Sequence, residues 1–396
     1  MKRVVISLSG GVDSSVAAYL LKRQGYDVIG LFMVNWDNSN NILTGNCNWE
    51  EELKVAEIVA RQLKFPLHIV DYSVEYEERI INNMFSEYKS GNTPNPDILC
   101  NRDIKFDLLL NKAREFDCDF FATGHYCRIE KINKNGKIIS RLLKGVDPGK
   151  DQSYFLSLLT QEKLKNVLFP IGHLYKKQVR EIAKKANLAT SDKRDSQGLC
   201  FVGKINLPAF LTEKIENKKG KIIEIPANSE IYKSGLNKEI ENDIPANGYS
   251  LNYSYDETNG KHIGNHYGIY YYTYGQRKGL NIGGTKEPLY IISLDAEKNI
   301  VYVGQGKNHP GLYKNRLKIK DRSINWIRED LAQPTCRSEK FNFKIRYRQP
   351  DQPGKLVINK TGAFVLFNEG QRGITPGQFV TWYQNDELIG SGIIEE

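Results

Sequence analysis

A regular alternation of strand-like and helix-like segments in the first third of this 396-residue chain constrains its fold more than any other feature. Short apolar runs of strand length stand at residues 4–8, 28–33, 67–70 and 120–122. Between them, apolar residues recur at helical spacing over 13–24, 51–63, 75–89 and 103–115. Strands that alternate with helices are typical of a parallel sheet with helices on both faces. We therefore predict an α/β fold for the N-terminal part of the chain.

The pattern changes after about residue 210, and a chain of this length is expected to form more than one domain. Helical periodicity fades there, and Gly, Asn, Pro and Tyr become frequent over 220–290. Further on, strand-like segments stand at 289–294, 300–303, 340–348, 355–359, 363–368, 378–384 and 388–394. Closely spaced short strands are typical of a compact antiparallel barrel. We predict three domains, which are an α/β domain over 1–210, a small, mostly β domain over 211–288 and an antiparallel β-barrel over 289–396.

The charge balance favours a partner that carries phosphate. The chain has 56 Lys and Arg against 47 Asp and Glu, a net charge of +9. Such a surplus favours phosphate-bearing partners, although a protein that is basic for solubility alone would look the same. No run of about 18 apolar residues occurs, and the N-terminus begins with a strand-like segment instead of a signal peptide. We therefore expect a cytoplasmic protein that does not span a membrane.

The turn between the first strand and the first helix reads Leu8-Ser9-Gly10-Gly11-Val12-Asp13-Ser14-Ser15. Adjacent glycines let the backbone approach a phosphate closely, and the start of the helix presents N–H groups and its positive dipole end. The serine hydroxyls add donors, and Asp13 is suited to hold a Mg²⁺ ion that bridges phosphates. A Walker A loop would place a lysine in the turn, and this turn has none. The turn predicts a phosphate site unlike that of the standard P-loop NTPases, and a tight turn with a capped helix is the alternative.

Two of the six cysteines follow polar turns. The loop Thr93–Asn101 is stiffened by two prolines and leads into a helix whose first turn is predicted to hold Cys100, and Cys200 lies within Asp195–Phe201. A helix N-terminus lowers a thiol pKa and favours the reactive thiolate, whereas a lone cysteine is more often a small buried apolar residue. The sequence has no Cys-x-x-Cys pair, which argues against a zinc ribbon or a clustered iron–sulfur site. Without a secretion signal, a structural disulfide network is not expected either.

The octapeptide Leu8–Ser15 resembles the PP-loop of the ATP pyrophosphatases, which implies cleavage of ATP to AMP and pyrophosphate with adenylation of a substrate oxygen. The chain as a whole is similar to the tRNA-specific 2-thiouridylase family, in motifs spread over all three predicted domains. These motifs are Ser9–Ser14, Gly30–Met33, Thr93–Cys100, Ala122–Tyr126, Lys150–Phe155, Asp195–Phe201, Gly275–Leu280, Arg346–Gln349 and Thr375–Gln378. The resemblance implies a PP-loop domain at the N-terminus and replacement of the C2 oxygen of the wobble uridine (position 34) of tRNA by sulfur.

The resemblance also implies roles for three residues. Adenylation would convert the C2 oxygen, which is otherwise a poor leaving group, into part of AMP. Cys200 would carry the incoming sulfur as a persulfide. Cys100 would be the partner nucleophile, which either frees hydrosulfide or holds the sulfur while a transient Cys100–Cys200 disulfide forms. Asp97 would be the general acid/base, and an ordinary helix cap is the alternative reading of this residue.

The ligands of the family carry over residue by residue. ATP, with Mg²⁺ on Asp13, is expected at Ser7, Leu8, Ser9, Gly10, Gly11, Val12, Asp13, Ser14, Met33 and Gly124. The tRNA, expected to be an acceptor of Lys, Glu or Gln, would meet Asn95, Pro96, Asp97, His125, Lys150, Asp151, Gln152, Arg346, Tyr347 and Gln378. A structural histidine is nearly as good a reading of His125. An upstream persulfide donor, either a cysteine desulfurase or a relay protein, is implied but not identified.

One predicted strand of the barrel, Lys340–Gln349, alternates between apolar and cationic residues. Phe341, Phe343, Ile345 and Tyr347 would share one face, and Lys340, Lys344, Arg346 and Arg348 the other. A cationic face suits contact with phosphate, and a merely solvated face is the alternative reading.

Some parts of the sequence receive no role from the resemblance. The stretch Lys233–Tyr272 is longer and richer in Asn and Tyr than the family leads us to expect, which indicates an insertion in the central domain. Cys47, Cys118, Cys127 and Cys336 are taken as structural.

Two other functions remain open at the level of sequence. A PP-loop synthetase that forms an amide from a small acid would need ATP but neither Cys100 nor Cys200. A non-catalytic protein that uses ATP only as a switch for tRNA binding would release no pyrophosphate.

Overall fold

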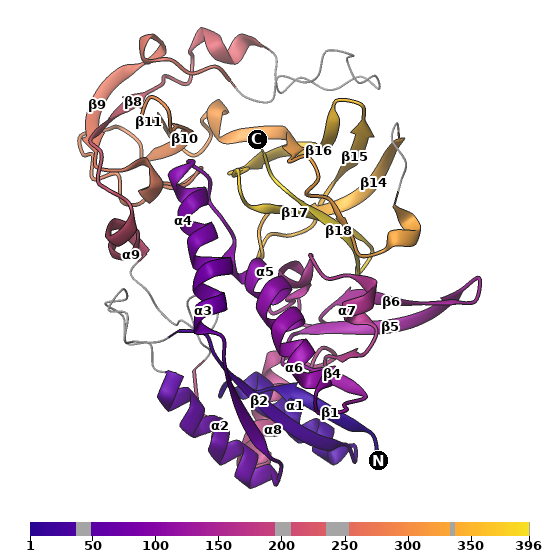
Figure 1. The fold of residues 1–396 in the computed structure, drawn as a ribbon. Coiled ribbons are helices and arrows are strands. Elements are labelled where there is room, and N and C mark those ends of the chain that lie inside the picture. Colours follow the sequence, from indigo (N-terminus) through magenta and orange to yellow (C-terminus); the bar gives the residue numbers. More distant parts are fainter. Residues whose placement is uncertain (37–48, 195–206, 235–252, 333–336, 396) are drawn as a thin grey trace.

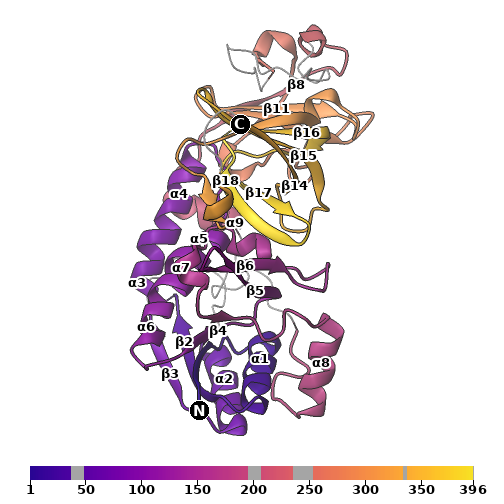
Figure 2. The same ribbon diagram turned by 90° about the vertical axis from the view of Figure 1, so that its right-hand side faces the viewer.

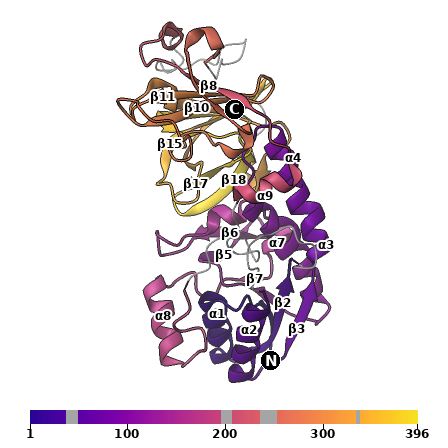
Figure 3. The same cartoon turned by 90° about the vertical axis from the view of Figure 1, so that its left-hand side faces the viewer.

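The computed structural model describes residues 1–36, 49–194, 207–234, 253–332 and 337–395. Within these residues, helices and strands form a parallel sheet with its helices, a small central sheet and a large antiparallel sheet (Figure 1). The parallel sheet lies at one end of an elongated molecule, and the central and antiparallel sheets lie next to each other toward the other end (Figures 1, 2 and 3). No helix in the described part of the chain has both the length and the apolar character needed to cross a membrane.

The N-terminal sheet is parallel, as the alternating pattern predicts. Its strands are β1 (Arg3–Ser7), β2 (Asp27–Val34), β3 (Leu67–Asp71), β4 (Phe120–Ala122) and β7 (Val167–Leu168), in the order β3-β2-β1-β4-β7. The chain starts in the middle of the sheet, builds outward through β2 and β3, and then returns to the other side of β1 with β4. Open α/β sheets bind ligands at such a switch point, beyond the carboxyl ends of the two central strands.

Helices cover both faces of this sheet, which confirms the predicted layers. One face carries α1 (Val12–Arg23), α2 (Trp49–Leu63) and α8 (Lys176–Lys185). The other carries α3 (Ser73–Tyr76), α4 (Asn82–Lys89), α5 (Pro96–Cys100) and α6 (Leu110–Arg114), with π-helical segments at Glu77–Ile81 and Asn101–Leu109. Val4 and Ile6 of β1 pack into the first core and Val5 into the second, because successive side chains of a strand point to opposite faces. Full burial of each such side chain contributes about 1.5–3 kcal/mol.

The central sheet differs from the prediction in its membership. It consists of β8 (Gly220–Glu224), β9 (Lys261–His266), β10 (Leu289–Asp295) and β11 (Ile300–Gln305), in the order β10-β11-β8-β9. The sequence pattern predicts the segments at 289–294 and 300–303 as barrel strands, but β11 pairs in parallel with β8 of the central sheet. Since both faces of β11 are buried, its sequence shows no alternation that would reveal its partner. We therefore propose that the central domain extends to about residue 305. Residues 235–252 of the expected insertion lie outside the described residues.

The C-terminal strands form the antiparallel sheet that the sequence predicts. They are β12 (Tyr313–Ile319), β13 (Asn325–Trp326), β14 (Arg337–Lys344), β15 (Gln352–Asn359), β16 (Gly362–Arg372), β17 (Phe379–Gln384) and β18 (Glu387–Ile393). Their core contains Phe343, Val365 and Trp382. The remaining α-helices of the described residues are the short α7 (Gln161–Leu164) and α9 (Leu207–Lys214), and short 3-10 helices occur in the connections.

A hairpin from the N-terminal part extends this antiparallel sheet. Strands β5 (Cys127–Lys134) and β6 (Lys137–Lys144) pair with each other, and β6 pairs with β18 (Figure 1). The two-residue turn Asn135-Gly136 has positive φ at both positions, the conformation that a tight hairpin turn requires. One hydrophobic core also runs from α4 and α5 to Phe379 and Leu388. The α/β part and the barrel are therefore packed as one body.

Candidate active site

The phosphate loop leaves β1 at the switch point, and its own hydroxyls fix its shape. The Ser14 hydroxyl accepts a hydrogen bond from the Ser9 N–H (3.2 Å) and donates one to the Gly11 carbonyl (3.1 Å). Gly10 has φ +70°, and a Cβ there would lie 2.3 Å from the backbone oxygen of Glu52. The first glycine is therefore required both by conformation and by the close approach of α2.

The start of α1 is open to an anion. Its N-cap is Gly11, so no side chain of the described residues caps the helix. The backbone of Gly124, just beyond β4, passes so close that a Cβ there would lie 2.7 Å from the Ser14 nitrogen. Met33 is buried near the end of β2. The structure thus brings Ser7–Ser14, Met33 and Gly124 together at the carboxyl ends of β1, β2 and β4.

Two lysines from distant parts of the chain reach this loop, and sequence reasoning missed both. Lys176 Nζ lies 2.7 Å and 2.9 Å from the two carboxylate oxygens of Asp13, and the Tyr126 hydroxyl donates to the same carboxylate (2.7 Å). Lys193 Nζ donates to the Gly10 carbonyl (3.0 Å) and pairs with Glu52. The Asp13 carboxylate is therefore already neutralised, and a Mg²⁺ ion would compete with Lys176 for it.

The chemistry of the donors limits how a metal could be held. In the described residues no group of three or more His, Cys, Asp or Glu side chains is arranged to bind a metal ion. A Mg²⁺ ion that bridges phosphates needs few protein ligands, because phosphate oxygens and waters supply the rest. The single carboxylate of Asp13 fits that mode of binding.

The loop before Cys100 begins a helix one turn earlier than predicted. The Asn95 side chain caps α5 by accepting from the Ile98 N–H (3.3 Å), and Pro96 takes the first helical position, which suits its fixed φ. Asp97 is thus not the cap, and that alternative reading of it is wrong. Cys100 is the fifth helical residue, beyond the first turn in which the helix dipole acts strongly, and it is fully buried.

Gln378 holds this loop from the barrel side. Its amide nitrogen donates to the carbonyls of Thr93 (2.9 Å) and Pro94 (3.0 Å), and its amide oxygen accepts from Asn95 (3.2 Å). Two predicted motifs that are 283 positions apart in sequence therefore interlock. Both the nitrogen and the oxygen of the Gln378 amide are hydrogen-bonded to the loop, so in this structure Gln378 fixes the position of the loop.

Of the three residues predicted to contact tRNA in the turn 150–152, Asp151 is buried and not exposed as expected. Asp151 is only 5% exposed, and its carboxylate accepts hydrogen bonds from the N–H groups of Gly145 (3.2 Å) and Ser153 (3.0 Å). Lys344 also pairs with it (3.2 Å). Lys150 stays partly exposed. Asp151 is therefore placed to shape the turn, and its carboxylate is not presented at the surface.

The predicted cationic strand ends early. β14 stops at Lys344, which is buried between Asp151 and Asp351 and does not lie on a cationic face, because the two carboxylates neutralise it. Arg346 is exposed in the following turn. The Tyr347 hydroxyl donates to the Lys150 carbonyl (3.4 Å). The structure therefore does bring the predicted Lys150 and Arg346-Tyr347 segments together.

His125 is a buried residue. It is 8% exposed, and its Nδ1 lies 2.7 Å from the Thr123 hydroxyl. Burial lowers the pKa of His125 well below its usual value, and the nearby Lys105 lowers it further. The imidazole is neutral near pH 7 and is not presented for RNA contact.

The second proposed catalytic cysteine lies outside the described residues. The segment Asp195–Phe201 with Cys200 is not described, nor are Cys47 and Cys336. There is no disulfide bond among the cysteines that the structure does describe, and the transient Cys100–Cys200 disulfide is not supported. Burial raises the pKa of Cys127 well above the usual thiol value, as for an inert core residue.

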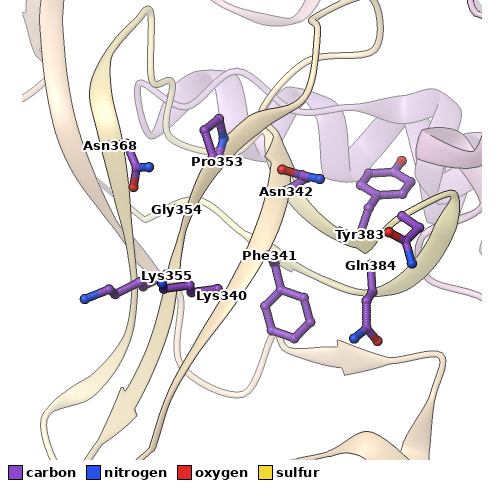
Figure 4. A pocket seen from close by; sticks show the side chains of 10 residues that line it. Lys340, Phe341, Asn342, Pro353, Gly354, Lys355, Asn368, Tyr383 and Gln384 are labelled. Carbon is purple, nitrogen blue, oxygen red and sulfur yellow. The ribbon is translucent and has the colours of Figure 1, made fainter.

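A shallow groove of about 330 Å³ lies on the outer side of the barrel (Figure 4). Lys340 of β14 stands directly opposite Lys355 of β15, and Asn342, Asn368 and Gln384 also line the groove. Like charges opposite each other across two strands are unfavourable unless water or an anion separates them. Lys340 is exposed, as the alternation of apolar and cationic residues in the sequence predicts.

Comparison with known proteins matches all three parts of the fold. A family model described as "tRNA methyl transferase HUP domain" matches residues 2–204. Two more, described as "tRNA methyl transferase PRC-barrel domain" and "Aminomethyltransferase beta-barrel domain", match residues 253–305 and 316–394.

Full-length relatives carry a more specific name, "tRNA-specific 2-thiouridylase MnmA". The protein of Christiangramia forsetii is 50% identical over 395 residues, which is 100% of both chains. That of Flavobacterium johnsoniae is 48% identical over 398 residues, again 100% of both chains. That of Chlamydia trachomatis is 42% identical over 396 residues, covering 100% of this chain and 98% of the relative.

Proposed function

This chain belongs to the tRNA-specific 2-thiouridylase family, and on that premise we propose which of its residues bind ATP, hold the tRNA and carry the sulfur. It is a sulfurtransferase that replaces the C2 oxygen of a tRNA uridine with sulfur. The observation that supports this function best is the phosphate loop Ser7–Ser14 at the central strand of a parallel sheet, in a chain similar over its full length to thiouridylases.

ATP is the cosubstrate, and we propose that its phosphates lie along Ser7–Ser14 at the start of α1. The fit is supported by the close approaches at Gly10 and Gly124, where a side chain would fill the space, and by the uncapped helix start. Met33 and Gly124 would line the adenosine. ATP would adenylate the C2 oxygen of the uridine and release pyrophosphate, so that this oxygen leaves as part of AMP when sulfur takes its place. Asp13 would hold Mg²⁺ on the phosphates.

The target in this proposal is the wobble uridine (position 34) of tRNAs that accept Lys, Glu or Gln. The base has to leave its stack to reach the protein. The loop Asn95–Asp97 would receive it, held in place by Gln378. Lys150, Gln152 and Arg346-Tyr347 would contact the RNA next to it, since they lie together where the α/β part meets the barrel. Asp151 would act only by shaping this turn, and His125, buried against Thr123, would not contact the RNA.

The sulfur would arrive as a persulfide on Cys200, delivered by an upstream desulfurase or relay protein. Cys100 would be the nucleophile that acts on it, and Asp97 the general acid/base for proton movement at the base. Cys100 is fully buried, which would keep water from the reacting sulfur.

The test is thiolation of unmodified tRNA by the purified full-length protein with ATP, Mg²⁺ and a sulfide or persulfide source. Digestion of the RNA and mass analysis should show 2-thiouridine at position 34. Cys100→Ser and Cys200→Ser should each abolish the product, and Cys118→Ser should retain it.

Two results would contradict the proposal. Pyrophosphate release without any thionucleoside, even with a physiological persulfide donor, would leave adenylation but remove the sulfur assignment. Absence of tRNA-dependent ATP turnover would favour the amide-forming synthetase instead.

A further inference from the structure

The phosphate loop has no lysine of its own, yet a fixed positive charge lies beside it. Lys176 Nζ is bound to both carboxylate oxygens of Asp13, at 2.7 Å and 2.9 Å, and its side chain is 13% exposed. A polyphosphate that enters the loop carries several negative charges. The Asp13 carboxylate alone would repel them, and an ammonium at this place removes that repulsion by neutralising the carboxylate.

Lys176 is held at both ends. It is the first residue of α8, and its backbone N–H donates to the Asp147 carboxylate (2.9 Å). Its ammonium also lies 5.9 Å from the centre of the Tyr126 ring, whose hydroxyl binds the same Asp13. A long side chain fixed in this way loses little further freedom when a ligand arrives, which favours binding.

Lys193 is also paired with a carboxylate, that of Glu52, but its ammonium donates to the Gly10 carbonyl of the loop as well. It therefore ties the backbone of the loop to α2 and holds the shape of the loop. We treat Lys193 as a positioning residue.

We propose that Lys176 binds the phosphates of ATP and so supplies, from α8, the cation that the loop itself lacks. In this structure it pairs with Asp13. When the phosphates enter the loop, the ammonium would donate a hydrogen bond to phosphate oxygen, with or without Mg²⁺, since it has three donors. Asp13 would hold Mg²⁺ where the metal is present. The inference rests on the proposed use of ATP at this loop.

The alternative role of Lys176 is only to neutralise Asp13. Measurements of nucleotide affinity distinguish this role from phosphate binding. Calorimetric titration of the full-length protein with ATP and with AMP, in buffer free of Mg²⁺, measures affinity without any turnover. Lys176→Met should weaken ATP about 10- to 100-fold, the range for a lost hydrogen bond to a charged group, and AMP by much less. Lys177→Met, the exposed neighbour on the same helix, should leave both affinities unchanged.

The decisive comparison is made in Asp13→Asn protein, in which no carboxylate needs to be neutralised. If Lys176 binds phosphate, adding Lys176→Met to Asp13→Asn still weakens ATP about 10-fold. If that second substitution has no effect, or if Lys176→Met leaves ATP affinity unchanged in the wild-type background, the inference is overturned. Lys176→Arg, which keeps the charge, should retain most of the affinity, and it guards against a Met variant that fails to fold. Wild-type protein that bound no ATP would instead overturn the proposed function itself.

Discussion

Gly10 and Gly25 both hold a left-handed backbone, with φ of +70° and +82°, but only Gly10 has another part of the chain against it. Replacement by Ala should cost about 1 kcal/mol of stability at either site, because a Cβ is disfavoured at positive φ. At Gly10 the Cβ would also meet the Glu52 backbone at 2.3 Å, so the loop must move. We predict that Gly10→Ala loses ATP binding while Gly25→Ala keeps it, as measured by titration calorimetry alongside thermal unfolding. Equal ATP affinities in the two variants would show that the contact with Glu52 does not shape the loop.

His125 should make the stability of the fold depend on pH. Burial lowers its pKa below the usual value of 6.5, so the unfolded chain takes up a proton that the folded chain does not. Stability from this group is therefore complete above about pH 6.5 and is lost as the pH falls below that value, by up to about 1.4 kcal/mol per pH unit. His266 and His309 have lowered pKa values for the same reason and add to the slope.

We therefore predict that His125→Gln reduces this slope without abolishing it, as measured by urea unfolding between about pH 7 and pH 5. His173→Gln, which changes an exposed histidine, is the matched control. A slope in His125→Gln equal to that of the wild type would mean that His125 takes up its proton in the folded protein as readily as in the unfolded chain.

The sequence predicted individual residues well where the chemistry is local. The loop Leu8–Ser15 carries its glycines, hydroxyls and helix start within eight positions, so its shape could be inferred. The contact of Lys176 with this loop could not be inferred, because Lys176 is 163 positions from Asp13 in sequence and no neighbouring residue distinguishes it from the other lysines of α8. For the same reason the burial of Lys344 was missed, since the aspartates that neutralise it come from distant segments.

Among the contacts between elements, the hydrogen bonds between Gln378 and the loop Thr93–Asn95 should affect the rate of thiolation more than the affinity for tRNA. Gln378→Ala removes three hydrogen bonds that fix the loop carrying Asp97 toward Cys100. We predict a fall of about 10- to 100-fold in kcat for thiolation, because small misplacement of reacting groups is costly. The dissociation constant for tRNA should change far less.

The matched control for this variant is Gln384→Ala, at an exposed position of β17. Kinetic and binding measurements on both variants separate the two roles of Gln378. A large loss of tRNA affinity with kcat preserved would show that Gln378 contacts the RNA directly and that its hydrogen bonds to the loop do not affect catalysis.

Helices and strands could be predicted wherever the apolar residues of the sequence recur with a clear periodicity. The parallel strands and helices of the N-terminal part follow their apolar periodicity within a few residues, as at β4. Pairing was harder, because β10 and β11 are apolar runs that suit either sheet. The hairpin of β5 and β6 was missed although its Asn135-Gly136 turn is a local signal for such a structure.

At the scale of the whole molecule, hydrogen bonds connect the proposed tRNA-contact turn to the phosphate loop by two routes. Gln152 accepts from the Tyr126 N–H (3.0 Å), and the Tyr126 hydroxyl donates to Asp13 (2.7 Å). Asp147, at the start of the same turn, accepts from the Lys176 N–H (2.9 Å), and Lys176 pairs with Asp13. The barrel joins this network through Lys344 and Asp151 within the turn.

A shift of this turn on tRNA binding would therefore reach Asp13, so that ATP and tRNA should bind cooperatively. Coupling between two sites typically changes affinity by about 5- to 150-fold, and linkage requires the same factor for both ligands. We predict that saturating tRNA tightens binding of a non-hydrolysable ATP analogue by at least about 5-fold, and that the analogue tightens tRNA binding equally. Tyr126→Phe, which removes only the hydroxyl bound to Asp13, should bring the factor closer to one, whereas Tyr267→Phe at an exposed position should not. If the factor in Tyr126→Phe protein equals that of the wild type, the coupling does not run through Tyr126, and Asp147→Asn then tests the route through Lys176.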